Sequence, residues 1–373
     1  MPSVLHSADL HLRDRQYNTS SRAADFRSAF EQVLDIGIRE KVAAILLAGD
    51  LLDNNRPSSE TIEFLFQMDR KLVAANMPCF VCNGDHDKTD PPWLSLMGGI
   101  PDGGRGGFRV LENERATIPG TDLTVYGLDF IGKTKDRFLE LKDSLPASDI
   151  LLWHTMVKEF AGFMEINGEG AVSLAEIPFE KFSFIALGDL HARKYLRNDA
   201  TGCWIGYPGP TEICKGDEKA QKSVTIVDFD DAHKVTDLRE IPLKTRTAFF
   251  YRLNRSEEVD AAVAEAAKVR DENPIIIARY NRNLPGVISR FYEALDPDKA
   301  IMRLTAMAED EGTSPGQTLI EEERTVESFL PEWFRPGSEI HTMSEACCRP
   351  DAPVNDLLNA YVDSYMAKEA AGA

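Results

Sequence analysis

The first 87 residues alternate strand-like and helix-like patterns, and a polar residue follows each strand. Short apolar runs predict strands at Val4–Ser7, Ala43–Leu47 and Cys79–Cys82. Helical spacing of apolar residues predicts helices near Ala23–Arg39 and Glu60–Ala75. This order is typical of a parallel sheet. Because the carboxyl ends of parallel strands lie at one edge of a sheet, the residues that follow them are expected to meet there.

Residue types that commonly bind metals follow these three strands and two later predicted strands. They are DLH (Asp9, His11), GDLLD (Asp50, Asp53), GDHD (Asp85, His86, Asp87), LLWH (His154) and GDLH (Asp189, His191). Each motif alone is common, since polar residues often begin loops. Their joint occurrence in this order predicts one cluster of carboxylates and imidazoles that holds metal ions.

Composition limits the class of protein. The chain has 373 residues, 43% hydrophobic and 28% charged, which fits a globular protein with more than one domain. The sequence has no apolar stretch of about 18 residues and no basic, apolar leader, so we expect no membrane span and a cytoplasmic, intracellular location. The formal charge of -19 argues against nonspecific coating of nucleic acid, but it does not exclude a nuclease.

Six cysteines are too few for a disulfide scaffold in a chain of this length. We expect buried thiols at four of them, which lie in or beside apolar runs: Cys79, Cys82, Cys203 and Cys214. The spacing of Cys79 and Cys82 also suits zinc, but no second pair has that spacing because Cys347 and Cys348 are adjacent. Core packing is therefore the favoured interpretation.

The pattern along the chain predicts four segments. Further strands up to about residue 240 predict two packed sheets flanked by helices, an α/β sandwich, in residues 1–240. Residues 241–307 repeat strand and helix patterns and predict a small second α/β domain. Residues 308–325 are polar and acidic, as in a linker, and residues 326–373 carry two amphipathic helix patterns.

The five metal motifs resemble those of the calcineurin-like metallophosphoesterase superfamily. The second domain, the helical tail and the YPGP turn at Tyr207–Pro210 make the chain similar to the SbcD-type nuclease subunits of bacterial and phage SbcCD complexes. The resemblance implies a DNA nuclease of double-strand-break repair and recombination, an exonuclease on DNA ends and an endonuclease on single-stranded or hairpin DNA. It also implies a homodimer and an SbcC-type coiled-coil ATPase as partner.

The resemblance further implies a role for each residue of the cluster. Two Mn²⁺ ions, or Mg²⁺, would be the cofactors. One ion would be held by Asp9, His11 and His191, the other by Asp85, His154 and Asp189, with Asp50 bridging the two. His86 would protonate the leaving oxygen as the general acid. Asp53 would orient His86 through a hydrogen bond; the alternative is that Asp53 caps a helix.

Two residues depart from the family pattern, which usually has Asn at position 85 and His at position 189. Asp85 and Asp189 both add carboxylate oxygen to the second metal position, and such hard ligands favour Mn²⁺ or Mg²⁺. The alternative is that the second position is lost and the protein is a non-catalytic, DNA-bridging scaffold. A further alternative is that the chain is a phosphatase or a cyclic nucleotide phosphodiesterase with the same metal core.

Contacts with DNA and with partners are less sharply indicated. Local basic residues are candidates for DNA contacts, although each is also compatible with plain surface charge: Arg13, Arg15, Lys88 and Arg193. The two predicted tail helices carry apolar residues that suit docking to the ATPase or packing on the body of this chain: Phe329, Leu330, Trp333 and Phe334, then Leu357, Leu358, Tyr361 and Tyr365. Self-association is expected through the helices near 60–75 and 93–97.

Overall fold

The computed structural model describes residues 1–17, 19–87, 93, 107–129, 135–160, 171–216, 218, 221–296 and 299–307. The chain divides into two units, Met1–Gly312 and Thr313–Ala373, and all described residues belong to the first. The predicted linker, the predicted helical tail and Lys88 lie outside the described residues. In the described part, no helix combines the length and apolar character needed to cross a bilayer.

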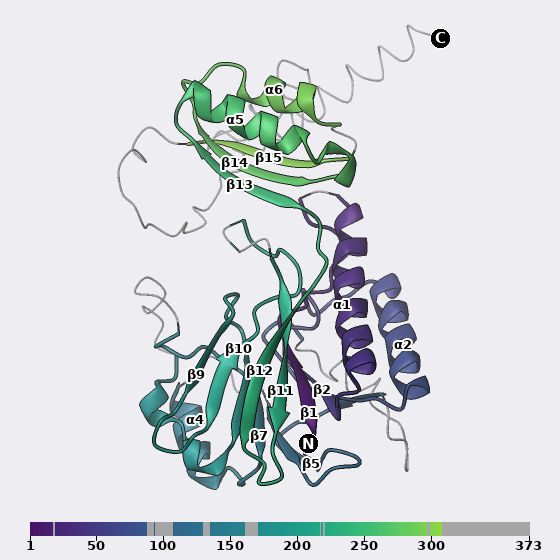
Figure 1. Ribbon diagram of the computed structural model, residues 1–373, viewed down its shortest axis with the longest axis vertical. Helices are drawn as coiled ribbons and strands as arrows, with labels where there is room; N and C mark the ends of the chain where they lie inside the picture. Colours follow the sequence, from purple (N-terminus) through teal and green to yellow (C-terminus); the bar gives the residue numbers. More distant parts are fainter. Residues whose placement is uncertain are drawn as a thin grey trace, which may run out of the picture. The chain divides into compact units, whose positions relative to one another are not determined.

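The first sheet has six strands and contains the predicted βαβαβ opening (Figure 1). Its order is β12 (Val235–Pro242), β11 (Ser223–Phe229), β1 (Ser3–Ser7), β2 (Ala44–Ala48), β3 (Pro78–Cys82) and β4 (Gly107–Val110). Strands β1 to β4 run parallel, whereas β11 and β12 are antiparallel to their neighbours. The crossover helices are α1 (Ser21–Glu40) and α2 (Ser59–Ala74).

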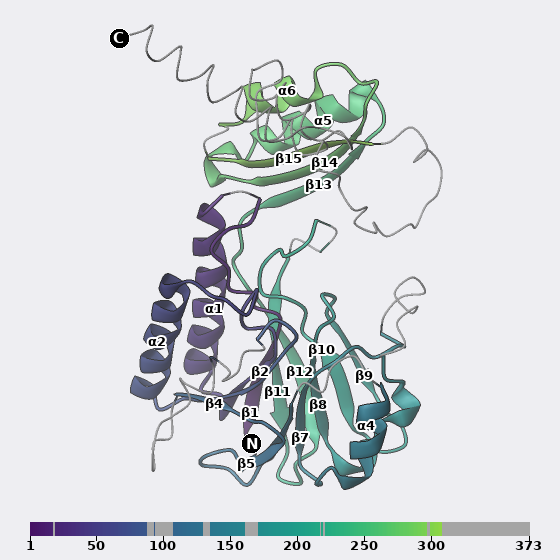
Figure 2. The ribbon, with the colours of Figure 1, turned by 180° about the vertical axis from the view of Figure 1, so that it is seen from behind.

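The second sheet also has six strands, seen from behind in Figure 2. Its order is β5 (Glu114–Thr117), β6 (Thr124–Leu128), β7 (Ile150–His154), β8 (Phe184–Gly188), β10 (Trp204–Tyr207) and β9 (Lys194–Arg197). The four central strands β6, β7, β8 and β10 are parallel. The connection from β6 to β7 contains helix α4 (Lys135–Leu141) and a short helix at Lys142–Ser144. The connection from β7 to β8 contains short helices at Leu174–Glu176 and Phe179–Lys181.

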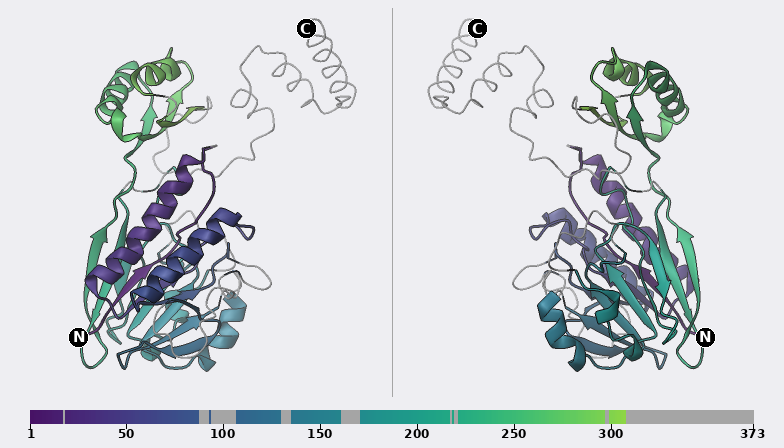
Figure 3. Two further views of the ribbon diagram at one scale, coloured as in Figure 1. Left: turned by 90° about the vertical axis from the view of Figure 1, so that its right-hand side faces the viewer. Right: turned by 90° about the vertical axis from the view of Figure 1, so that its left-hand side faces the viewer.

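The two sheets pack face to face with helices on both outer faces, which gives four layers. Strand residues alternate between the two faces of each sheet, so each sheet contributes to an inner and an outer apolar cluster. Leu5 and Ile45 face outward and pack with Phe30 under α1 and α2, which lie side by side in Figure 3. Between the sheets, Leu46 and other inward residues meet Leu152 and its neighbours on the second sheet. The outer face of the second sheet has its own apolar cluster. The predicted two-sheet α/β sandwich is confirmed.

A three-stranded parallel sheet follows, made of β13 (Ala248–Leu253), β14 (Ile275–Asn281) and β15 (Ile301–Met307). Helices α5 (Ser256–Ala267) and α6 (Val287–Ala294) pack on one of its faces, and a short helix spans Arg270–Glu272. Its other face contacts Ile213 and Tyr17 of the preceding part of the chain. The domain boundaries at 240 and 307 stay a prediction.

Cys79 and Cys82 point to opposite faces of β3. Cys79 packs in the outer cluster with α1 and α2, while Cys82 packs between the sheets. Both thiols are buried, and burial raises the pKa of each well above its usual value. The two sulfur atoms therefore serve core packing, as predicted. Cys203 is also buried, but Cys214 is only partly buried and lies elsewhere, beside the polar cluster.

Candidate metal centre

The five motifs converge at the carboxyl ends of β1, β2, β3, β7 and β8. Four of the predicted ligands have left-handed backbone conformations, with φ of 53° at Asp9, 43° at His11, 50° at Asp50 and 107° at Asp189. Such conformations cost about 1–3 kcal/mol each in non-glycine residues and persist where the surrounding structure imposes them. The strand ends thus turn sharply, which directs these side chains to one place.

Glycines in the motifs permit the close approach of neighbouring strand ends. A Cβ atom at Gly188 would collide with the Ala48 carbonyl oxygen and the His154 ring. A Cβ atom at Gly84 would collide with the backbone nitrogen and the carboxylate of Asp50. The glycine of each GD pair is therefore needed to bring one strand end against the next.

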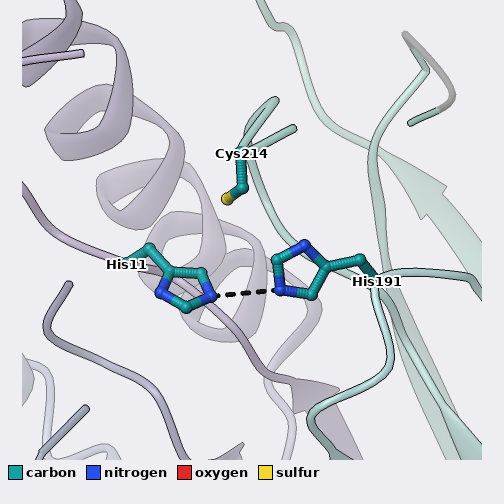
Figure 4. Close-up of side chains that lie close together, drawn as sticks. All are labelled: His11, His191 and Cys214. Atoms are coloured by element: carbon teal, nitrogen blue, oxygen red, sulfur yellow. Dashed lines mark hydrogen bonds between the residues drawn. The ribbon is translucent and has the colours of Figure 1, made fainter. Parts of the chain in front are cut away.

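One group of predicted ligands gathers around His11. Ligand atoms of Asp9, His11 and Asp50 lie within 4.8 Å of one another. The His11 Nε2 atom is 3.1 Å from His191 Nε2 and 3.8 Å from Asp50 Oδ2. Figure 4 shows the two imidazole rings facing each other, with Cys214 beside them. The predicted residues of the first metal position are therefore adjacent.

A second group contains Asp85, His154 and Asp189, whose ligand atoms also lie within 4.8 Å of one another. The His154 Nε2 atom is 3.5 Å from Asp50 Oδ2, the same oxygen that faces His11. Asp50 therefore lies between the two groups, where the resemblance placed a bridging carboxylate. Both departures from the family pattern, Asp85 and Asp189, are in this group.

The first group fits a cation. Asp9 is fully buried, and its Oδ2 atom has no hydrogen-bond partner among the described residues, while its Oδ1 atom accepts the Asp189 N–H at 2.9 Å. Burial raises the pKa of Asp9 to about 7. Burial, together with the nearby cationic side chains of His191 and Arg13, holds the pKa of His11 well below its usual value. A buried carboxylate oxygen without a proton donor is stabilised by a bound cation.

His154 is held in place by the end of β2, a strand of the first sheet. Its Nδ1 atom lies 2.8 Å from the Ala48 carbonyl oxygen, which leaves Nε2 directed toward Asp50. A backbone carbonyl that binds one ring nitrogen commonly orients the other toward a metal. Burial lowers the pKa of His154, but the carboxylates of Asp50, Asp9 and Asp189 outweigh burial and raise that pKa to about 9.

His86 lies at the open side of the cluster. Its side chain is 46% exposed, and its Nε2 atom is 4.0 Å from Asp50 Oδ2. The Nδ1 atom is 2.6 Å from the carbonyl oxygen of Asp53, so the backbone of Asp53 orients the ring. The Asp53 carboxylate instead pairs with Arg13 at 2.5 Å. Ser58 caps α2, so the alternative role of Asp53 as the cap of that helix is wrong.

Sequence reasoning missed Glu218, which supports the first group. Its Oε1 atom is 2.6 Å from His191 Nδ1, and Lys222 contacts its other oxygen at 2.6 Å. The hydrogen bond to His191 and the charge of Lys222 offset burial and lower the pKa of Glu218. A carboxylate on Nδ1 leaves the Nε2 lone pair of His191 for a metal. No local pattern marks Glu218, because it is 27 residues from His191.

Asp87 was noted in the GDHD motif without a role, and the structure gives it a structural one. It is buried and accepts the N–H groups of Leu51, Leu52 and Gly84, which ties the loop after β2 to the loop after β3. Burial raises the pKa of Asp87 to about 6.

The candidate DNA contacts differ in their surroundings. The Arg13 side chain is mostly buried in its pair with Asp53, and Arg15 is exposed. The Arg193 guanidinium is 3.4 Å from Glu240 and lies over the Tyr195 ring. Their contact with DNA stays a prediction.

Comparison with known proteins shows which protein family this part of the chain is similar to. Residues 2–172 match the family model described as calcineurin-like phosphoesterase. The chain has the calcineurin-like metallophosphoesterase fold. The matched metallophosphoesterase region contains the β1, β2, β3 and β7 motifs, so it includes Asp9, Asp50, Asp85 and His154.

Proteins similar to this chain include archaeal repair proteins. The DNA double-strand break repair protein Mre11 of Sulfurisphaera tokodaii is 26% identical over 98% of this chain and 88% of the relative. The protein of the same name from Methanosarcina acetivorans is 30% identical over 65% of this chain, which spans 39% of that relative. A solved dimetal phosphatase from Danio rerio is 11% identical, with a TM-score of 0.41 over 61% of this chain and 92% of the other.

Proposed function

We propose that this chain is a two-metal DNA nuclease of a double-strand-break repair complex, with Mn²⁺ as its preferred ion. The proposal rests mainly on Asp50, whose Oδ2 atom lies within 3.8 Å of His11 and 3.5 Å of His154, one from each ligand group. Two divalent ions held there would activate water as Lewis acids and neutralise charge on the phosphate. His86, on the open side, would donate a proton to the departing sugar oxygen.

The similarity to Mre11 over 98% of the chain supports DNA as the substrate. A second support is a basic row on the helix-free face of the β13–β15 sheet. Arg252 pairs in register with Arg279, and Arg303 lies beside Ile277 on the next strand. Strand alternation places these arginines on the face away from α5 and α6. Arginines spaced along one face bind phosphates of a nucleic acid backbone.

Hydrolysis assays with Mn²⁺ test the substrate class. We expect cleavage of linear duplex ends and of hairpin DNA, with little turnover of a phosphopeptide or a cyclic nucleotide. The opposite order would assign the metal centre to a phosphatase or phosphodiesterase. Binding of DNA without cleavage, at any Mn²⁺ concentration, would assign it to a scaffold.

The two departures in the second group allow a direct test of that group. We expect the double variant Asp85→Asn, Asp189→His to remain active but to lose preference for Mg²⁺, because an imidazole replaces a hard oxygen ligand. Activity is titrated against Mn²⁺ and Mg²⁺ for the parent and the variant. If the parent is inactive and the variant gains activity, the second metal position is degenerate in the natural protein and the nuclease proposal is wrong.

We also propose that the chain forms a homodimer through α2. Phe66 on this helix is 44% exposed, and it lines an apolar hollow with Ile62 and Arg70. We expect a dimer by sedimentation at micromolar concentration, weakened at least about tenfold by Phe66→Glu, since burying a charge in an apolar interface is costly. Ile288→Glu on α6, which is 47% exposed, is the control and should leave the dimer intact. A strictly monomeric parent would exclude this interface.

The predicted tail, residues 326–373, supplies the proposed docking segment for an SbcC-type coiled-coil ATPase. The basis is its two apolar helix patterns in the sequence, since the tail lies outside the described residues. A cytoplasmic location follows from the proposed role in DNA repair.

A further inference from the structure

We propose that Cys214 is a sulfur ligand of the metal ion held by His11 and His191. This inference rests on the proposed metal centre and adds its ion selectivity. The Cys214 Sγ atom and one ring nitrogen of each histidine lie within 4.8 Å of one another. Figure 4 shows Sγ directed toward the space between the two rings. Two imidazoles and one sulfur form a ligand set that zinc and cobalt accept readily.

The orientation of the histidines supports a ligand between them. The Glu218 carboxylate accepts the Nδ1 proton of His191, so the Nε2 lone pair of His191 faces His11 Nε2 at 3.1 Å. Asp9 is fully buried, and one of its carboxylate oxygens lies within 4.8 Å of ligand atoms of His11 and Asp50. Its Oδ2 atom has no hydrogen-bond partner in the described part of the chain. A cation at this place would bind both nitrogen atoms and this oxygen, and Cys214 lies at its edge.

The position of Cys214 is built by the protein and needs no metal to form. The Cys214 N–H donates to Glu218 at 3.0 Å, so the residue that orients His191 also fixes the backbone of Cys214. The Gln16 side-chain amide donates to the Ile213 and Cys214 carbonyl oxygens at 3.1 and 2.8 Å. Ile213 itself is buried against Ile275 and Ile301. These hydrogen bonds therefore hold the thiol beside the imidazoles.

The two metal positions then differ in chemistry. The first has nitrogen and sulfur ligands with Asp9 and Asp50, whereas the second group has the carboxylates of Asp85 and Asp189 with a single imidazole. Thiolate and imidazole favour Zn²⁺ and Co²⁺ over Mn²⁺, and oxygen ligands favour Mn²⁺ and Mg²⁺. A metal ion binds the thiolate, so the Cys214 proton leaves to solvent when the ion binds. The first position would therefore bind Zn²⁺ or Co²⁺ more tightly than Mn²⁺, and the preference for Mn²⁺ in the proposed nuclease would belong to the second position.

Cobalt absorption tests the sulfur ligand without measuring activity. The full chain is used with Cys347→Ser and Cys348→Ser, because these adjacent cysteines are alternative sulfur ligands. We expect Co²⁺ to produce a sulfur-to-cobalt charge-transfer band that is lost in Cys214→Ser. Cys203→Ser is the matched control, since Cys203 is buried in the outer cluster of the second sheet, and it should keep the band.

Metal affinities give a second measurement. Cys214→Ser should weaken Zn²⁺ binding at least about tenfold, the size of loss seen when groups supporting metal ligands are removed, and leave Mn²⁺ binding nearly unchanged. Cys214→Asp, which replaces sulfur with oxygen, should shift preference toward Mn²⁺. Circular dichroism confirms that each variant is folded.

The outcomes separate this inference from the proposed function. Cobalt bound by the parent without a sulfur band, a band that persists in Cys214→Ser, or equal losses of Zn²⁺ and Mn²⁺ affinity would each overturn the sulfur ligand and leave the metal centre standing. If the parent binds no divalent ion at all, the metal centre and the proposed nuclease are both wrong.

Discussion

Replacing His86 with asparagine should reduce Mn²⁺-dependent DNA cleavage about a hundredfold or more, the usual contribution of a positioned general acid. The imidazole Nε2 lies 4.0 Å from Asp50 Oδ2, at the open side of the cluster, while Nδ1 is held by the Asp53 carbonyl oxygen. Asparagine can keep the hydrogen bond to that carbonyl oxygen, but it cannot deliver a proton at neutral pH. Single-turnover cleavage of a linear duplex measures the loss.

Metal binding decides whether the loss arises from proton transfer. The His86→Asn protein should bind the same number of Mn²⁺ ions as the parent, because we propose His86 as a proton donor and not as a ligand. His233→Asn is a suitable control: His233 pairs with Asp149 away from the cluster, and its φ of 60° is one that asparagine tolerates. Loss of bound Mn²⁺ in the His86 variant would make His86 a ligand and contradict this role.

Replacing Arg22 with methionine should lower the free energy of unfolding by about 3–5 kcal/mol, the cost of removing one partner from a buried ion pair. The Arg22 side chain is fully buried, 2.6 Å from Asp25 and 3.2 Å from Glu212. It also donates to the Ile213 carbonyl oxygen and to Gln16. Methionine fills a similar volume but leaves the buried Glu212 carboxylate without its cation.

Two further variants make this stability prediction specific. Arg27→Met lies on the same helix, where the arginine is partly exposed and its pair with Asp14 spans 3.6 Å, so the change should cost less than about 1 kcal/mol. Adding Glu212→Gln to Arg22→Met should recover part of the loss, because the uncompensated charge is removed. Urea unfolding monitored by circular dichroism gives the three values. An Arg22→Met loss no larger than that of Arg27→Met would contradict the prediction.

Arg22 also links stability to the metal centre. It contacts the loop that carries Ile213 and Cys214, and Asp25, its other partner, pairs with Arg246 just before β13. A weakened Arg22 network should therefore loosen the loop beside His11 and His191. Weaker Zn²⁺ binding in Arg22→Met, measured well below its unfolding midpoint, would report this connection.

The sequence by itself determined the two sheets and the ligand clusters of this protein. Buried central strands such as Ala44–Ala48 and Phe184–Gly188 are apolar along their whole length, which is a local signal. The ligands follow those strands directly, so parallel pairing was enough to predict that Asp9, Asp50 and Asp189 lie together. All four strands at the edges of these two sheets, β4, β5, β9 and β12, were missed, because their charged residues interrupt any continuous apolar run.

Only the tertiary structure decided how the cluster is supported. The Asp53 carboxylate pairs with Arg13, and a backbone carbonyl takes its predicted place at His86. Glu218 supports His191, and Cys214 lies beside His11 although the sequence assigned it only to a buried position. These contacts join segments up to some 200 residues apart in the chain. They form because the loop after β10 folds over the carboxyl ends of the strands of the first sheet. Local patterns report burial and periodicity, and they hold no information about which distant side chain fills a given space.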